Sequence, residues 1–274
     1  MASQILCINN VQLQMLGPAV TGTTNVLKAA SAVNVQRVVV VSSIVAVEIS
    51  PKDWPEGKIR DESCWSDKEF CRSIESTHSQ DLLCFYLEKL QDLLSRFGAL
   101  CTPELVPGRQ DHLRRGGARI RAADRARRGD YQSRVGVGPL LQPTVNSSIQ
   151  FLIYSLKGGP DLVRNKLWHI VDVRDLADTL LLLYEVPEAA GRHICAPHVI
   201  SARDLLDLLK SMYPDYPFIT KESICDRDHP APMTSDKLKK IGWSCRPLEE
   251  TILDTVECCQ RTGFLDDVAE ETPC

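Results

Sequence analysis

The stretch "PAVTGTTNVLKAASAVNVQRVVVVSS", residues 18–43, decides the fold class of this chain. Residues 18–31 open with a proline and threonines suited to a first helical turn, and their apolar side chains recur at helical spacing. Four consecutive valines, Val38–Val41, follow between polar residues, as is typical of a strand buried on both faces of a parallel sheet. A helix leading into such a strand is half of a βαβ unit, so we predict an α/β fold.

Outward from this stretch, helices and strands continue to alternate. Residues 51–67 are rich in proline and charge and are expected to form a loop. The other expected elements are helices over 81–97, 148–158, 201–214 and 247–265, a strand running into a helix over 167–186, and a short strand over 191–196. The helix over 201–214 has a serine cap and an apolar stripe, and the helix over 247–265 has acidic residues in its first turn, where the helix dipole favours them. This order predicts a larger sheet domain followed by a smaller C-terminal lobe.

The composition is that of a soluble globular protein: 274 residues, 43% hydrophobic and 25% charged, with a formal net charge of -4. This balance argues against a nucleic-acid-binding protein. Eleven cysteines are scattered without a C-x-x-C pair. We therefore expect no disulfide framework and no metal site, and a reducing, cytoplasmic location. We also expect no signal peptide and no membrane span, because the longest apolar runs are too short.

Six strings in the chain carry a resemblance to a known family: "GTTNVLKAA", "RVVVVSS", "DESCWSD", "GPLLQPTVNSS", "LWHIVDVRDLADTLLLLYE" and "GRHICAPHVIS". Together they resemble plant cinnamoyl-CoA reductases and dihydroflavonol reductases, which are extended short-chain dehydrogenases. The resemblance covers about residues 15–75 and 136–270. It implies an NADP-dependent reductase with a Rossmann-type, doubly wound parallel sheet and a C-terminal substrate lobe.

The same resemblance implies a domain organisation and a substrate class. Residues 1–149 would form a partial dinucleotide-binding domain that lacks its first βαβαβ half, with 77–136 aberrant, and residues 150–274 would form the C-terminal lobe. The implied reaction is hydride transfer from NADPH to an aldehyde, ketone or thioester carbonyl of a phenylpropanoid or flavonoid. The implied partner is that small molecule, with no nucleic acid and no membrane, and the oligomeric state stays open.

The family uses a serine, a tyrosine and a lysine at its active site. By position, Ser43 matches the catalytic serine, Ser42 matches its neighbour beside the cofactor, and Ser148 matches a residue near the nicotinamide ribose. The serine would hydrogen-bond the substrate carbonyl, and the tyrosine, its pKa lowered by the lysine ammonium, would donate the proton. The residues alone also fit a simpler interpretation, in which Ser42 and Ser43 only end a strand.

Two parts of the family site are not found in this sequence. The glycine-rich turn that binds the pyrophosphate is absent, and the pair Gly116 and Gly117 follows no strand and opens no apolar helix. No Y-x-x-x-K occurs where the family has one. Tyr86 and Lys89 are three residues apart, in a stretch best interpreted as an ordinary amphipathic helix. We therefore expect an inactive protein, or a non-catalytic remnant that acts by binding or as a decoy.

Residues 106–136 occupy the place of the missing tyrosine and lysine and contain nine arginines and no lysine. Permitted codons for residues 105–112, shifted by one base, encode WYLAGKT, which contains a Y-x-x-x-K. The shifted frame continues through residue 130 as a sequence resembling the family helix and strand. We interpret the segment as the family's own coding sequence read out of frame. A solvated or disordered basic segment and a nucleic-acid-binding arm are the alternatives.

Three polar residues in "WHIVDVRD", His169, Asp172 and Asp175, suggest a metal or acid–base site. Their spacing on a strand-to-helix turn brings no ligand set together, so we assign the segment to fold support. By resemblance, Asp175 caps the following helix. On this interpretation Asp175→Ala lowers stability by about 1 kcal/mol.

The sequence also predicts how stably the chain folds. With neighbouring strands missing, Val38–Val41 would expose apolar faces and unpaired backbone groups. We predict that residues 104–136 are disordered or poorly packed, and that the isolated protein aggregates without a cooperative thermal transition. A sharp calorimetric transition, together with protease resistance at residues 114–128, would show that this segment is a genuine structural element.

Overall fold

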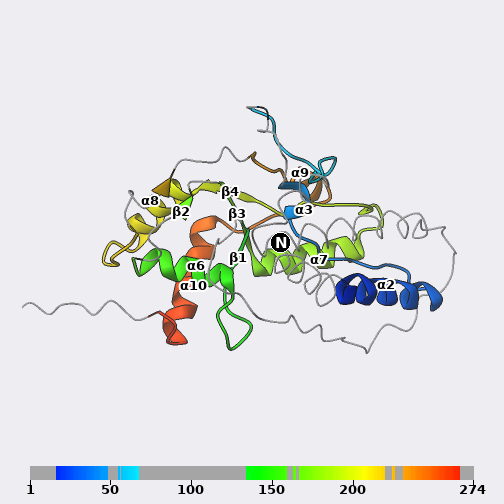
Figure 1. The fold of residues 1–274 in the computed structure, drawn as a ribbon, viewed down its shortest axis with the longest axis horizontal. Helices are drawn as coiled ribbons and strands as arrows, with labels where there is room; N and C mark the ends of the chain where they lie inside the picture. The colour runs from blue at the N-terminus through cyan, green and yellow to red at the C-terminus, as the bar shows by residue number, and fades with distance from the viewer. Residues whose placement is uncertain are drawn as a thin grey trace, which may run out of the picture.

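The computed structural model describes residues 17–48, 55, 57–67, 134–158, 163–164, 167–219, 224–225 and 231–265. The described helices are α2 (Gly17–Ala32), α3 (Val45–Glu48), α6 (Ser147–Leu156), α7 (Val173–Glu185), α8 (Ala202–Met212), α9 (Asp236–Lys240) and α10 (Leu248–Arg261). The described strands are β1 (Arg134–Val137), β2 (Val163–Arg164), β3 (Leu167–Asp172), β4 (His198–Ser201) and β5 (Ile224–Cys225). In Figure 1 the strands β1, β3 and β4 lie centrally, with α6, α8 and α10 to one side and α2 and α7 to the other.

A three-stranded mixed sheet in the order β1-β3-β4 organises the described part of the chain. β1 pairs with β3 in parallel, with Val137 opposite Asp172. β3 pairs with β4 antiparallel, with Trp168 opposite Ile200. A separate parallel pair joins β2 to β5. Because parallel strands end at the same edge of a sheet, the carboxyl ends of β1 and β3 meet, and the segments that follow them lie in contact.

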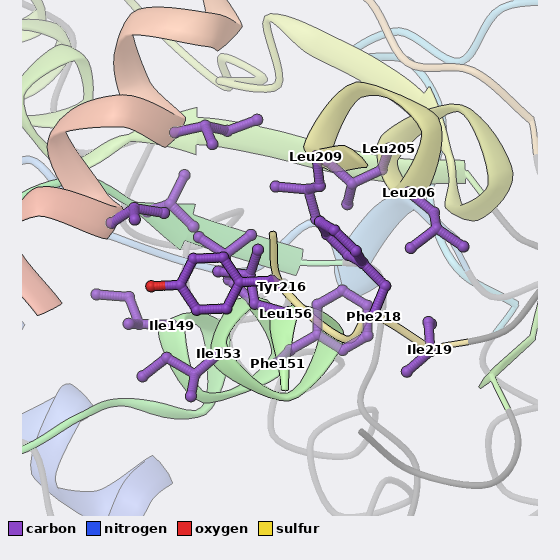
Figure 2. Packing of buried hydrophobic residues seen from close by; sticks show 14 of the residues in the cluster. Ile149, Phe151, Ile153, Leu156, Leu205, Leu206, Leu209, Tyr216, Phe218 and Ile219 are labelled. Atoms are coloured by element: carbon purple, nitrogen blue, oxygen red, sulfur yellow. The ribbon is translucent and has the colours of Figure 1, made fainter. Parts of the chain in front are cut away.

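The main core lies between one face of this sheet and the helices α6, α8 and α10. Trp168 and Ile170 of β3 are almost fully buried in it, and the Trp168 ring stacks on Phe151 of α6 with centroids 4.1 Å apart. Figure 2 shows the α8 leucines Leu205 and Leu209 packed over the α6 side chains. Each large apolar side chain buried in this way contributes about 1.5–3 kcal/mol. This core joins the three-stranded sheet to α6, α8 and α10.

Most of the helices predicted within the described residues are confirmed. α2 covers the predicted 18–31, α6 falls within 148–158 apart from its first residue, and β3 runs directly into α7 as expected over 167–186. α8 begins where its serine cap was predicted, with the Ser201 hydroxyl accepting a hydrogen bond from the backbone N–H of Asp204 at 3.0 Å. α10 carries Glu249 and Glu250 in its first turn, where the helix dipole favours them. The loop expected over 51–67 has no helix or strand in its described residues.

The strand predicted at Val38–Val41 is wrong. These residues form no strand in the structure, and Val41 is 60% exposed. A strand needs a hydrogen-bonded neighbour, and none of the described strands pairs with this stretch. Instead, the Arg37 guanidinium donates to carbonyl oxygens at the C-terminus of α7, among them those of Leu183 (2.8 Å) and Pro187 (3.0 Å). A cation at a helix C-terminus is favoured by the helix dipole, so this contact holds the stretch beside α7.

Two smaller expectations also need correction, and two further regions cannot be compared with the structure. Residues 191–196 form no strand; the N–H groups of Ile194 and Ala196 donate to the side chains of Glu62 and Ser235, and the strand β4 begins at His198. Residues 134–136 belong to β1, so the prediction of poor packing is wrong for these three residues. The rest of the arginine-rich segment and the helix expected over 81–97 lie outside the described residues. In the part of the chain that is described, no helix is both long and apolar enough to cross a membrane.

Candidate functional site

The predicted catalytic and cofactor-contacting serines lie at the start of α3. We call Ser42 and Ser43 the serine turn. The carbonyl of Ser43 accepts a hydrogen bond from the Ala46 N–H at 3.0 Å, and the carbonyl of Ile44 accepts from the Val47 N–H at 2.8 Å. Ser42 is exposed and Ser43 is half-buried. The backbone therefore turns into a helix directly after the two serines, and the roles of their side chains stay predictions.

Residues 57–67, which we call the arm, connect α3 to residues 192–194 and 232–234. Arg60 is in a parallel bridge: its N–H donates to the carbonyl of Pro232 at 2.8 Å, and its carbonyl accepts from Thr234 at 3.0 Å. Its buried guanidinium donates to the carbonyl of Val47 in α3. A second bond to α3 comes from the N–H of Ser66, at 2.8 Å. The arm thus holds α3 against residues 232–234.

A second set of contacts holds residues 62–65 of the arm. The Arg192 guanidinium donates to the carbonyls of Glu62 (3.0 Å) and Cys64 (2.9 Å) and lies 3.3 Å from the centroid of the Trp65 ring. The Glu62 carboxylate accepts from the N–H of Ile194 at 2.9 Å. A cation over an aromatic face adds about 0.5–2 kcal/mol, depending on how far it is desolvated. Sequence reasoning missed these residues, because the contacts join positions about 130 residues apart.

The turn after β1 packs closely on the start of α7. Gly138 has φ +129°, and a Cβ there would lie 2.9 Å from Val173 Cγ2 and 3.0 Å from Asp172 Oδ1. The fully buried Asp172 carboxylate receives two hydrogen bonds from the Arg174 side chain, at 2.9 and 2.7 Å, and Arg174 also reaches Asp254 at 2.6 Å. Burial favours a higher pKa for Asp172, but the hydrogen bonds from Arg174 outweigh it and hold the pKa below its usual value.

Ser148, the third predicted site residue, lies in the first turn of α6. That helix is capped by Asn146, whose side-chain oxygen accepts from the N–H of Ile149 at 2.9 Å. Figure 1 shows α6 and α3 well apart, on different sides of the central strands. The roles of Ser42, Ser43 and Ser148 toward a cofactor stay predictions.

Asp175 does not cap α7, which corrects the role predicted for it. The N-cap is Asp172, whose carboxylate accepts from the N–H of Arg174 at 2.8 Å. Asp175 lies inside the first turn, 1% exposed, and its carboxylate binds both the guanidinium and the backbone N–H of Arg246, the latter at 2.9 Å. Its own carbonyl accepts from Trp243 Nε1 at 3.2 Å. Asp175 therefore joins α7 to the segment before α10.

The first turns of the longer helices show whether the described residues could hold a cofactor phosphate, since exposed N–H groups at such turns are the usual phosphate ligands. In α6, α7 and α8 the side chain of the N-cap residue, Asn146, Asp172 or Ser201, accepts from one of these N–H groups. The first turn of α10 contains Glu249 and Glu250, which repel an anion. The first turns of these four helices are therefore poorly suited to a phosphate.

The remaining reactive groups in the described residues give no further site. Within the ranges that the structure describes, no group of three or more His, Cys, Asp or Glu side chains could hold a metal ion. Burial raises the pKa of the Cys195 thiol to about 11, and that of Cys259 likewise to about 11. Thiols with such pKa values are protonated at neutral pH and make weak nucleophiles.

Comparison with known proteins places the chain in a family. No family model matches it. Cinnamoyl-CoA reductase 1 of Petunia hybrida is 33% identical over 256 residues, which cover 92% of this chain and 68% of the relative. The cinnamoyl-CoA reductase 1 of Arabidopsis thaliana is 31% identical over 261 residues, with 92% and 65% covered. A bifunctional dihydroflavonol 4-reductase/flavanone 4-reductase of Pyrus communis is 26% identical, with 94% and 68% covered. The chain spans about two thirds of the length of these curated relatives.

Solved structures show the same fold at lower identity. Vestitone reductase from alfalfa superposes with a TM-score of 0.58 at 21% identity, covering 82% of this chain and 64% of that one. A yeast methylglyoxal/isovaleraldehyde reductase complexed with NADPH gives a TM-score of 0.64 at 20% identity, covering 93% and 73%. The predicted Rossmann-type α/β fold is therefore confirmed. With the identity to the curated reductases, it shows that this chain belongs to the family of the cinnamoyl-CoA and dihydroflavonol reductases.

Proposed function

We propose that this chain carries the serine turn and substrate lobe of an NADP-dependent reductase, and that as encoded it does not complete the reaction. The reaction class follows from the relatives: reduction of a carbonyl or CoA thioester of a phenylpropanoid or flavonoid. One observation carries the proposal. The serine turn leads directly into α3, whose Val47 packs with Ile194 and Met233, yet no tyrosine in the sequence is followed by a lysine four residues later.

The missing pair leaves the proton transfer without a donor. NADPH, when bound, supplies the hydride to the carbonyl carbon, and a proton must reach the carbonyl oxygen. Ser43 can donate a hydrogen bond to that oxygen, but a serine hydroxyl is far too weak an acid to give up its proton at neutral pH. General acid catalysis contributes about 10²- to 10⁴-fold to such steps. We therefore expect turnover to fall by at least this factor relative to an intact relative.

Cofactor affinity is the second reason for proposing inactivity. Ser42 and Ser148 are polar groups that could contact the nicotinamide ribose end of NADP, and they form hydrogen bonds of modest net value. The phosphates carry most of the charge of the molecule. They are usually bound by free N–H groups at a helix N-terminus, but in α6, α7 and α8 a cap side chain already binds one of these groups, and the first turn of α10 is acidic.

We predict that NADPH shows no saturable binding to this protein below millimolar concentration. The measurement is a titration of NADPH fluorescence, with the Petunia hybrida cinnamoyl-CoA reductase as a positive control under the same conditions. Saturation in the micromolar range would contradict the prediction. It would mean that a part of the chain other than the first turns of α6, α7, α8 and α10 supplies the phosphate site.

An activity assay distinguishes the proposed inactivity from full reductase activity. The purified chain is assayed with NADPH and either cinnamoyl-CoA or a dihydroflavonol, and a rate near that of the intact relative would refute the proposed inactivity. The alternative is a non-catalytic remnant that acts by binding or as a decoy, which the missing tyrosine and lysine equally favour. Retained binding of a phenylpropanoid or flavonoid without turnover would support that alternative.

A further inference from the structure

The extended stretch that leads into the serine turn pairs with none of the described strands. Val38–Val41 form no strand themselves, and the two described sheets are built from other segments. The first three valines are half-buried, and Val41 is 60% exposed. In a sheet, the backbone hydrogen bonds of the ladder fix where a strand lies and in which direction it runs. A different contact must therefore fix the residues that precede Ser42 and Ser43.

Arg37, the residue directly before the valines, makes such a contact. Its Nη1 donates to the carbonyls of Leu183 (2.8 Å), Tyr184 (3.1 Å) and Val186. Its Nη2 donates to the carbonyl of Pro187 at 3.0 Å. One guanidinium thus binds four carbonyls of a segment that is about 150 positions away along the chain.

The end of α7 provides acceptors that suit a guanidinium. The last four carbonyls of a helix have no partner inside it. Since α7 ends at Glu185, the carbonyls of Leu183 and Tyr184 are among these. The helix dipole also places partial negative charge there, which favours a cation, and the last turn of α7 contains no basic residue of its own. Arg37 supplies both the missing donors and the missing charge.

α7 is itself well held, so it can serve as an anchor for Arg37. It continues directly from β3. In its first turn, the Asp175 carboxylate binds the backbone N–H and the guanidinium of Arg246, and the Asp175 carbonyl accepts from Trp243 Nε1 at 3.2 Å. Arg37 therefore ties the valine stretch to a helix that is fixed to the sheet and to the segment before α10.

The serine turn lies between this contact and a second one. On its other side, the arm holds α3 through the N–H of Ser66, which donates to the Ala46 carbonyl at 2.8 Å, and through the Arg60 guanidinium, which donates to the Val47 carbonyl. Figure 1 shows the stretch running from the end of α2 along α7 to α3. Holding both ends of a short segment removes many conformations that it would sample with one end free.

We infer that Arg37 is a positioning residue for the serine turn. By binding the end of α7, it takes the place of a sheet partner and fixes the point from which the chain runs to Ser42 and Ser43. Arg37 acts through the backbone of residues 38–41. The inference rests on the proposed function for what the two serines would contact, but the position that Arg37 gives them requires neither cofactor nor substrate.

Hydrogen–deuterium exchange on the full chain, without NADPH or substrate, tests this role. The Ala46 N–H donates to the Ser43 carbonyl, so its exchange reports whether the serine turn is in place. Arg37→Met keeps a long side chain but removes the charge and the donors. We expect the Ala46 amide to exchange about tenfold faster in this variant, because hydrogen bonds from a charged donor are lost. The Ser66 amide and the amides of α10 should not change.

Two further variants show whether the carbonyl contact is responsible. Arg37→Lys keeps a cation with three donors at the end of α7, and should return the Ala46 exchange rate to within about threefold of the wild type. A role limited to packing of the aliphatic stem would instead be preserved in Arg37→Met. The matched control is Arg203→Met, since the Arg203 guanidinium also donates to a backbone carbonyl, that of Ile224 at 3.2 Å, but from α8. This variant should leave the Ala46 amide unchanged.

Three results would overturn the inference. These are wild-type exchange of the Ala46 amide in Arg37→Met, an equal loss of protection in α10, and an Arg37→Lys variant no better protected than Arg37→Met. Arg37→Gln replaces the methionine variant if the latter does not fold. None of these results bears on the proposed inactivity, because no cofactor or substrate is present. Conversely, micromolar binding of NADPH would refute the proposed inactivity without affecting the role of Arg37.

Discussion

Gly138→Ala is expected to lower the local stability of the β1–α7 junction by about 3 kcal/mol, the sum of a backbone term and a steric term. At φ +129° an L side chain is strained, which costs about 1–3 kcal/mol. The added methyl would also lie 2.9 Å from Val173 Cγ2 and 3.0 Å from the Asp172 carboxylate. Neither neighbour can move freely, because Val173 begins α7 and Asp172 is held by Arg174.

Local exchange protection in the full chain measures this effect. The amides of β3 and of the first turn of α7 should exchange about a hundredfold faster in Gly138→Ala, since 1.4 kcal/mol corresponds to a factor of ten. Gly136→Ala is the matched control on β1, because its φ is not positive and a Cβ there meets nothing within 4 Å. Equal protection in the two variants would show that Gly138 is not required for the close contact.

Helices and local caps are the features that sequence patterns predicted well. The cap at Ser201 and the acidic first turn of α10 depend on residues within four positions of each other. The apolar stripe of α8 likewise reflects a single helical face, with Leu205, Leu206 and Leu209 buried in the main core. Such features follow from short-range geometry, which a sequence displays directly.

Contacts between distant segments are the features that sequence patterns did not show. The arm depends on Arg192, and α7 depends on Arg246, each more than 70 positions from its partner. No local signal distinguishes these arginines from exposed ones. The valine stretch failed for a related reason, because a strand exists only with a paired neighbour and composition does not reveal whether one is present.

The sequence likewise predicted only part of the candidate site. Family resemblance assigned roles to Ser42, Ser43 and Ser148, and these roles stay predictions, because the structure shows where their backbones lie and not what their side chains would bind. The out-of-frame interpretation of residues 105–130 stays a hypothesis, because residues 105–133 lie outside the described ranges. The transcript sequence across codons 70–140 tests it, and an uninterrupted frame identical to the printed protein in independent transcripts would contradict it.

Asp175→Ala is expected to destabilise the junction of α7 with the segment before α10 by about 3 kcal/mol. The substitution removes the acceptor of two hydrogen bonds, one from the Arg246 backbone and one from its guanidinium. Removing one partner of a fully buried ion pair costs about 3–5 kcal/mol, and the lower end applies because the Arg246 side chain is 30% exposed. A helix cap alone would be worth only about 1 kcal/mol, so the size of the effect distinguishes the two roles.

The measurement for Asp175→Ala is again exchange protection in the full chain, for the amides of α7 and of residues 246–250. Asp178→Ala is the matched control, since Asp178 is 61% exposed and lies 3.9 Å from the same guanidinium, where an exposed pair contributes less than about 1 kcal/mol. In a double-mutant cycle, Arg246→Met should cost much less in the Asp175→Ala background than in the wild type, because the guanidinium contact is already gone. Additive effects would mean that the Asp175 side chain does not act through the Arg246 guanidinium. A loss near 1 kcal/mol, confined to the first turn of α7, would restore the capping role instead.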